Sequence, residues 1–237
     1  MPKLLCIPYA GSSAEVYRKW APLLGSRIDV VPLELPGRGK RFSEPFYESF
    51  SQGAADLANQ VLKQLTGNDT YALFGHSMGS WLAYEVYRKL QQEGAPMPFH
   101  LFVSGNHAPQ IPKEEKQLHK LPPREFQKEI LAIGGTPEII FENPDLASIY
   151  VPVLRNDYRI LESYSYEDDG TLVQCPVTVI AGQDDTLTNH ELRAWGELCG
   201  DVFDVAMIQG NHFYITEDPQ PAIRVILKEV LMTKGNR

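Results

Sequence analysis

Residues 75–79, which read G-x-S-x-G, constrain the fold more than any other stretch of the chain. The apolar run 71–74 before them is typical of a buried strand, and residues 80–90 after them carry apolar side chains at helical spacing. The motif therefore lies on a sharp strand-to-helix turn, where a serine projects above the sheet and flanking glycines allow close packing. This context predicts that Ser77 is a nucleophile. The amide of Met78, at the helix N-terminus, is then free to bind an oxyanion.

Strand and helix patterns alternate along most of the chain. Strands are expected at 4–8, 28–33, 71–74, 101–104, 176–180 and 203–208, and helices up to about 24 and at 52–65, 80–90 and 223–231. Strands that are apolar on both faces and alternate with helices predict an α/β fold, a mostly parallel sheet covered on both sides. Functional sites in such sheets lie at the C-terminal ends of the strands.

The stretch from about 111 to 169 interrupts this alternation. It spans about 60 residues between two predicted strands, where a crossover needs far fewer. A helix is expected at 118–133, a turn at 134–137 and two further helices up to Tyr164. The apolar content is too high for a solvated loop. We therefore predict one domain, 1–237, with a helical lid inserted over the active site.

Bulk properties exclude several classes of protein. The net charge of −8 argues against a nucleic-acid partner, which needs a basic surface. The chain shows neither a signal peptide nor an apolar run of membrane-spanning length, so a cytoplasmic location is expected. Cys6, Cys175 and Cys199 are widely spaced and predict neither a zinc site nor a disulfide framework, only buried reduced thiols.

A nucleophilic serine needs a base and an orienting carboxylate. His212 follows the last predicted strand, and Asp184 and Asp185 follow the strand before it, so all three fall at the edge where Ser77 sits. The order serine, aspartate, histidine is that of the α/β-hydrolases. His212 is predicted as the base. Asp185 is favoured over Asp184 because such hydrolases place the acid at the fourth position of a G-x-x-D turn.

The remaining histidines and the first loop complete the expected site. His76 is expected to be a packed neighbour of the turn rather than the base, and His107 is kept as a second candidate for the base. The other histidines, His100, His119 and His190, are expected in loops or on the surface. Ala10 or Gly11, after the first strand, should supply the second oxyanion amide, with Ala10 preferred.

These residues resemble the type II (external, editing) thioesterases of nonribosomal peptide and polyketide synthesis. The resemblance runs through nearly the whole chain. It rests on the motifs at 8–11 (PYAG), 35–39 (LPGRG), 74–79 (FGHSMG), 121–122 (LP), 126 (F), 134–137 (GGTP), 154–158 (LRNDY) and 210–213 (GNHF). Ser12 and Ser80 depart from it, since the family often has glycine at both positions.

The resemblance implies hydrolysis of acyl groups held as thioesters on the phosphopantetheine arm of carrier proteins. It implies a carrier protein domain as partner. No metal or other cofactor is expected, because the chain has neither H-E-x-x-H nor G-x-G-x-x-G, and a monomer is expected. The alternatives are a general carboxylesterase or small acyl-CoA thioesterase with the same triad, a silent carrier-binding scaffold, and a cyclising thioesterase.

The lid is a candidate docking face for the carrier. It combines apolar residues with five basic ones, Lys113, Lys116, Lys120, Arg124 and Lys128. The lid would then admit the phosphopantetheine arm and form part of the docking surface; the alternative is that these residues lie on ordinary solvated helix faces.

Overall fold

Six strands form a single sheet in the computed structural model, which describes residues 1–112 and 116–235. The strands are β1 (Lys3–Ile7), β2 (Asp29–Pro32), β3 (Tyr71–His76), β4 (His100–Ser104), β5 (Val177–Gly182) and β6 (Phe203–Ile208). Their order is β2-β1-β3-β4-β5-β6, and each of these neighbouring pairs is parallel. The predicted fold class is confirmed, and each predicted strand is present with its ends within two residues of the prediction.

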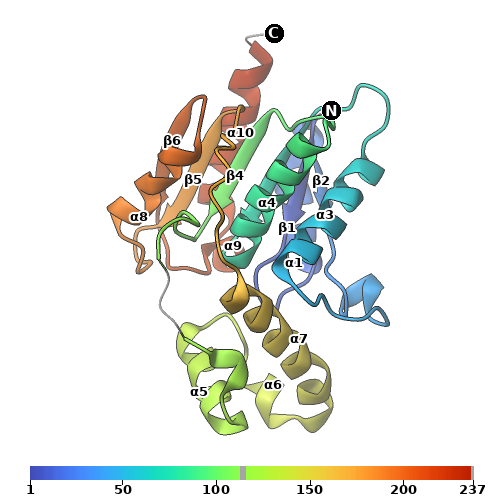
Figure 1. Cartoon of the computed structure of the whole chain (residues 1–237), viewed down its shortest axis with the longest axis vertical. Coiled ribbons are helices and arrows are strands. Elements are labelled where there is room, and N and C mark those ends of the chain that lie inside the picture. The colour runs from blue at the N-terminus through green and yellow to red at the C-terminus, as the bar shows by residue number, and fades with distance from the viewer. Residues whose placement is uncertain (113–115, 236–237) are drawn as a thin grey trace.

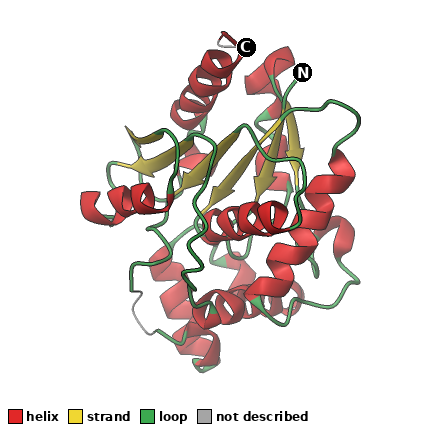
Figure 2. Ribbon diagram, turned by 45° about the horizontal axis from the view of Figure 1, so that its top comes forward, coloured by secondary structure: helices red, strands yellow, loops and turns green. Residues whose placement is uncertain are grey.

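Helices cover both faces of the sheet (Figure 2). They are α1 (Glu15–Arg18), α2 (Ala21–Leu24), α3 (Phe50–Gln64), α4 (Met78–Gln92), α8 (Asn189–Arg193), α9 (Tyr214–Glu217) and α10 (Gln220–Gly235), with short 3₁₀ turns at Gly25–Arg27, Gly39–Arg41 and Ala194–Leu198. The predicted first helical segment is in fact two short helices. The last helix, α10, extends beyond the predicted 223–231 at both ends.

Successive side chains of a strand point to opposite faces of the sheet, so each strand contributes to two hydrophobic cores. Leu5 and Ile7 of β1 point into the core shared with α3 and α4. Leu4 and Cys6 of the same strand point into the core shared with α1, α2 and α10. Both faces are therefore buried, which explains why the strands read as continuous apolar runs.

The segment between β4 and β5 forms a lobe apart from the sheet (Figure 1). It holds a 3₁₀ turn at Leu118–Lys120, then α5 (Pro123–Ile133), α6 (Ile139–Glu142) and α7 (Pro144–Ser163). These helices share a small core of their own around Phe126, Ile130 and Leu154. Lys113, one of the basic residues expected on the lid, lies outside the described residues.

The predicted single helix over 118–133 is wrong, because two prolines interrupt it. Leu121 and Pro122 have extended backbone angles, with ψ values of 146° and 154°. Pro123 disfavours helical angles in the residue before it and has no N–H to donate, so α5 begins there instead.

Two further expectations need correction. His100 is neither in a loop nor on the surface: β4 begins one residue earlier than predicted, so His100 is 2% exposed and its Nε2 lies 2.8 Å from Thr178 Oγ1. The three cysteines are free thiols, as expected, but only Cys6 and Cys175 are fully buried and Cys199 is half-buried.

None of the described helices has the length and apolar character needed to cross a bilayer.

Candidate active site

Ser77 occupies a strained turn between β3 and α4. Its φ of 53° makes it the one non-glycine with positive φ among the described residues. Such strain costs on the order of 1–3 kcal/mol and persists where the surroundings enforce it. A Cβ on Gly75 would lie 1.8 Å from Gly79 O, and one on Gly79 would lie 2.4 Å from Ile7 O. The glycines are therefore required by close packing, although Gly79 meets the backbone of β1 rather than that of β3.

Four hydrogen bonds hold the backbone of Ser77 in this conformation, one of them from Ser80 N–H to Ser77 O (2.9 Å). Its N–H donates to Ser104 O (2.8 Å) at the end of β4. Its carbonyl accepts from Asn106 Nδ2 (3.1 Å) and from Ser80 Oγ (2.6 Å). Ser80, one of the two departures from the family pattern, is thus accommodated by a bond to the turn itself.

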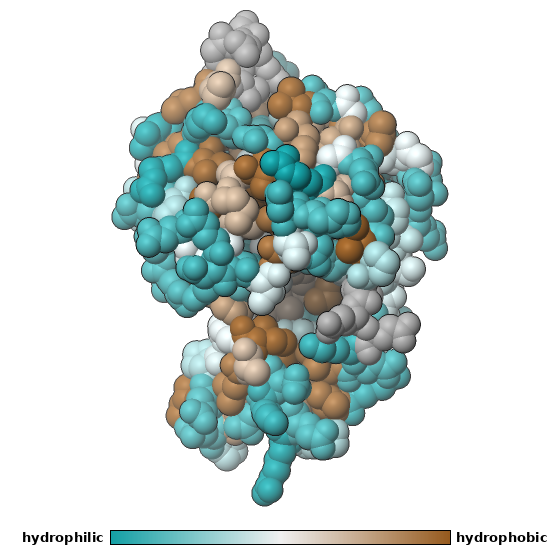
Figure 3. Space-filling model, turned by 90° about the vertical axis from the view of Figure 1, so that its left-hand side faces the viewer, coloured by the Kyte–Doolittle hydropathy of each residue, from teal (hydrophilic) through white to brown (hydrophobic). Residues whose placement is uncertain are grey.

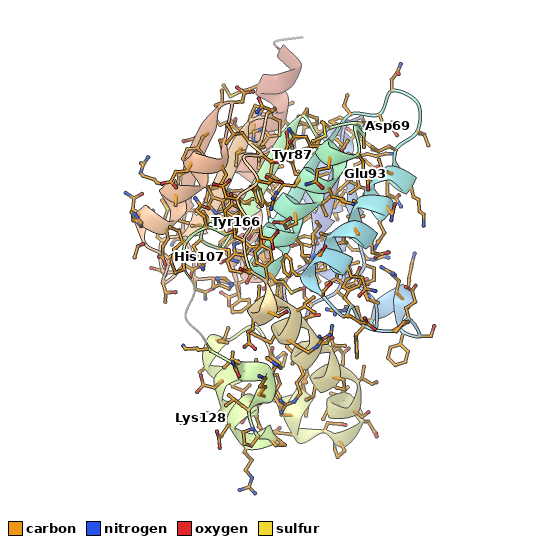
Figure 4. The ribbon with its side chains drawn as sticks, viewed as in Figure 1. Asp69, Tyr87, Glu93, His107, Lys128 and Tyr166 are labelled. Carbon is orange, nitrogen blue, oxygen red and sulfur yellow. The ribbon has the colours of Figure 1, made fainter. Side chains whose placement is uncertain are left out.

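The sheet register brings the other predicted residues to the same edge. His76, the last residue of β3, pairs with Ser104 of β4, and Gly182, the last of β5, pairs with Ile208 of β6. Asp185 and His212 lie in the loops that follow β5 and β6. Figure 4 shows His107 at the side of the body facing the lobe, while Asp69 and Glu93 mark the opposite end.

Asp185, and not Asp184, contacts His212. His212 Nδ1 lies 2.8 Å from Asp185 Oδ2, and the side chains of these two residues are 26% and 5% exposed. The second oxygen, Oδ1, accepts from Thr186 N–H (2.7 Å). Asp184 is exposed, and its own N–H donates to Gly210 O. A carboxylate only accepts, so His212 donates through Nδ1–H and keeps the lone pair on Nε2 free.

His76 links the turn to His212. It is fully buried, and its ring centroid lies 4.9 Å from that of His212. Its Nδ1 lies 2.8 Å from Ser104 Oγ, which in turn contacts the hydroxyl of Tyr214. Burial, with a smaller contribution from His212, lowers the pKa of His76 well below its usual value. His76 is therefore neutral and supports the ring beside it.

His107, the second candidate for the base, lies elsewhere. Its Nδ1 faces the carbonyl of Ala108 at 2.9 Å, and its ring packs edge-on against Trp81. It makes no bond to a carboxylate among the described residues. The geometry therefore favours His212.

Two amides were predicted to form an oxyanion hole. Met78 opens α4, and the N–H groups of a first helical turn have no partner within the helix. Gly11 N–H donates to Asp157 Oδ2 (2.7 Å), so it is already engaged. Ala10 N–H has no protein acceptor among the described residues. The geometry thus separates the two candidates in the first loop and leaves Ala10 available.

A cavity of about 450 Å³ opens beside this loop. Residues 9–13 form one wall, and 135–137 with the N-terminal half of α7 form another. A Cβ on Gly135 would lie 2.1 Å from the ring of Phe213, the residue after His212, so the lobe contacts the site directly. Figure 3 shows the narrowing between lobe and body, with apolar side chains along it.

A serine on a strained strand-to-helix turn, with a hydrogen-bonded histidine–aspartate pair at the same edge of a parallel sheet, defines an α/β-hydrolase. In residues 1–112 and 116–235, no three His, Cys, Asp or Glu side chains gather as a metal site would require.

Comparison with known proteins identifies the family. Residues 2–229 match the model of the thioesterase domain. The gramicidin S biosynthesis protein GrsT of Aneurinibacillus migulanus is 35% identical over 96% of this chain and 88% of its own. The structure of ClbQ from the colibactin NRPS/PKS pathway superposes with a TM-score of 0.90 at 33% identity, covering 98% of this chain and 97% of the other.

A third relative carries the family name in full. The type II thioesterase BorB from the borrelidin biosynthetic cluster superposes with a TM-score of 0.85 at 33% identity, covering 97% of this chain and 92% of its own. The chain therefore belongs to the thioesterase family, and within it to the type II enzymes that its motifs resemble. It is a thioesterase.

Sequence reasoning missed several residues that shape the site. Asn106, Ser104 and Tyr214 hold the turn and His76, and each is a common residue type in a loop, strand or helix without any distinguishing spacing. Arg38 and Asp157 belong to motifs quoted for the resemblance, but neither motif suggests that the two side chains meet, as they do here.

Proposed function

We propose that this thioesterase hydrolyses acyl groups carried on the phosphopantetheine arm of carrier protein domains, releasing stalled or mis-primed synthetase modules. One observation carries the catalytic part of the proposal: the hydrogen-bonded pair of His212 and Asp185 at the sheet edge that presents the strained Ser77. We assign Ser77 as nucleophile, His212 as base and Asp185 as the orienting acid.

The reaction proceeds in two halves. Ser77 Oγ attacks the thioester carbonyl while His212 Nε2 takes its proton. The amides of Met78 and Ala10 bind the oxyanion. The carbon–sulfur bond then breaks, and His212 returns its proton to the pantetheine sulfur as the thiol leaves. In the second half His212 activates a water, which attacks the acyl-serine ester and frees the carboxylic acid and Ser77.

No hydrogen bond joins the Ser77 hydroxyl to His212 among the described residues. Catalytic bonds of this kind often become aligned only in the substrate complex. Each proton and bond of the scheme is handled by the triad and water, so the reaction as proposed uses no metal or organic cofactor.

The choice of carrier-bound substrates rests on the relatives and on the cavity. ClbQ comes from an NRPS/PKS pathway, and BorB comes from a biosynthetic cluster. The cavity beside Ala10 is walled by both the body and the lobe, which suits an extended arm that enters between them. We propose that the lobe acts as the lid and forms part of the docking face of a monomeric enzyme.

The proposal is tested by incubating the protein with carrier domains loaded with a panel of acyl groups and following release by intact mass. The expected result is loss of the acyl mass with retention of the phosphopantetheine arm, and no release with the variant Ser77→Ala. Matched oxygen esters and acyl-CoA thioesters serve as controls. Faster turnover of these than of every carrier-bound thioester would identify a general esterase or acyl-CoA thioesterase instead.

A further inference from the structure

Arg38 and Asp157 form a buried ion pair between the body and the lobe. Arg38 lies in the loop after β2, and Asp157 lies on α7. Arg38 Nη1 lies 2.6 Å from Asp157 Oδ2 and Nη2 lies 2.6 Å from Oδ1, and the two side chains are 7% and 1% exposed. This is the two-pronged arrangement that gives arginine–carboxylate pairs both their strength and their fixed geometry.

Both members of the ion pair also form hydrogen bonds with the backbone of the first loop. Asp157 Oδ2 accepts from Gly11 N–H (2.7 Å), and Arg38 Nη1 donates to Ser12 O (2.9 Å). A Cβ on Gly11 would lie 2.3 Å from Leu154 Cδ2, so α7 also packs directly on this turn. One ion pair thus holds the Ala10–Gly11 peptide through its N–H and the Ser12–Ser13 peptide through its carbonyl, immediately after the amide of Ala10.

Stability alone is a weak reason for such a pair. The desolvation of two buried charges often outweighs their attraction, and apolar replacement of both partners is commonly neutral or stabilising. Here the ion pair joins the loop after β2 to α7, and it also forms hydrogen bonds with the first loop. An oxyanion hole needs its donors at fixed positions before the reaction starts, which is what this arrangement supplies.

We propose that Arg38 and Asp157 are positioning residues that hold the Ala10 amide in the oxyanion hole and couple the lid helix α7 to it. The proposal rests on the role of Ala10 in the proposed function. It follows that a shift of α7 away from the body releases Gly11 and loosens the oxyanion hole. The lid therefore cannot open on this side while the oxyanion hole binds the transition state.

The main test replaces both charges, in the variant Arg38→Met with Asp157→Leu. It leaves no uncompensated buried charge, so the fold should survive, while Gly11 N–H and Ser12 O lose their partners. Removing one oxyanion donor outright costs about 10²–10³-fold in kcat. For a donor that is present but loosely held, we expect a fall of about 10-fold to 100-fold in kcat with KM changed less than about threefold.

A second readout separates positioning from a merely structural role. A trifluoromethyl ketone analogue of the acyl group forms a tetrahedral adduct with the nucleophile, and its Ki should rise by the same factor by which kcat/KM falls. Active sites are titrated with a serine-reactive phosphonate, so that kcat is expressed per functional site. A loss of folded protein alone would leave the corrected kcat and the Ki unchanged.

The matched control removes another carboxylate that ties the chain beyond α7 to the body. Asp169 pairs with Arg88 on α4 at 2.8 Å, without contacting the first loop. Asp169→Asn should leave kcat within about twofold. Asp157→Asn weakens the bond to Arg38 and should lower kcat. An equal fall in both variants, or unchanged kcat and Ki in the double variant, would overturn the proposal.

Arg38→Lys covers the case in which the double variant does not fold. Lysine keeps the charge but is a point donor that cannot reproduce the two-pronged bond and also reach Ser12 O. It should lower kcat by about threefold to tenfold at constant KM, and full activity would sink the proposal. All variants are assayed on any ester or thioester that the wild type turns over, so a wrong carrier assignment would not affect the outcome.

Discussion

Replacing Asp185 by asparagine should change the tautomer of His212, moving its proton from Nδ1 to Nε2. Asp185 Oδ1 accepts from Thr186 N–H, so the amide oxygen of an asparagine is held at that position and its NH₂ group is turned toward His212. The NH₂ group can only donate, so it selects the tautomer with the lone pair on Nδ1 and the proton on Nε2. Such a histidine cannot accept the proton of Ser77.

The expected loss is about 10⁴-fold in kcat, which is the cost of a wrong histidine tautomer in serine proteases, or about 5.4 kcal/mol at about 1.36 kcal/mol per tenfold. Asp184→Asn is the matched control, because Asp184 is the exposed neighbour and its side chain is not bonded to His212. It should stay within about threefold of the wild type, because Asp184 takes no part in fixing the tautomer of His212 and an exposed substitution changes stability by no more than about 0.5 kcal/mol.

Both variants are assayed by acyl release from a loaded carrier under single-turnover conditions, after thermal unfolding has shown that each is folded. A greater loss with Asp184→Asn would mean that the acid is the other aspartate. A loss below about tenfold with Asp185→Asn would mean that Nδ1 does not need a carboxylate, and the tautomer argument would fail.

Three further predictions follow from the site and the core. Ser77→Ala should lower kcat by about a million-fold with an unchanged melting temperature, and activity above a few per cent would refute the assignment of the nucleophile. KM for a carrier-bound acyl group should change little between low and moderate salt and lie well below KM for the same group on a small thiol; equal values would remove the docking role of the lid. Burial lowers the pKa of His100 from 6.5 to about 4, so the unfolded chain binds more protons in this window and stability falls as pH falls through it. Urea unfolding should show about 2 kcal/mol less stability from this group at pH 5 than at pH 7, and His100→Gln should remove that difference.

The sequence by itself determined the parts of the protein that depend on near neighbours along the chain. The turn at Ser77 is local: a buried strand, two glycines and a helix within about twenty residues leave little choice of geometry. The periodicity of the strands fixed the sheet class, because both faces must be apolar in a parallel sheet. It failed locally at His100, where a polar residue begins a buried strand, and over 118–133, where paired prolines outweigh helical spacing.

Only the tertiary structure decided matters that depend on distant contacts and on side-chain direction. Asp184 and Asp185 are adjacent and identical; the G-x-x-D position favoured Asp185, and the path of the loop after β5 brings that carboxylate to His212. Ala10 was preferred over Gly11 as the second donor, but only the contact of Gly11 N–H with Asp157, on α7, shows that Gly11 is already engaged. Arg38 and Asp157 lie 119 residues apart, and no periodicity links such positions. Their contact exists because packing of α7 against the first loop buries both charges, and buried charges must be paired.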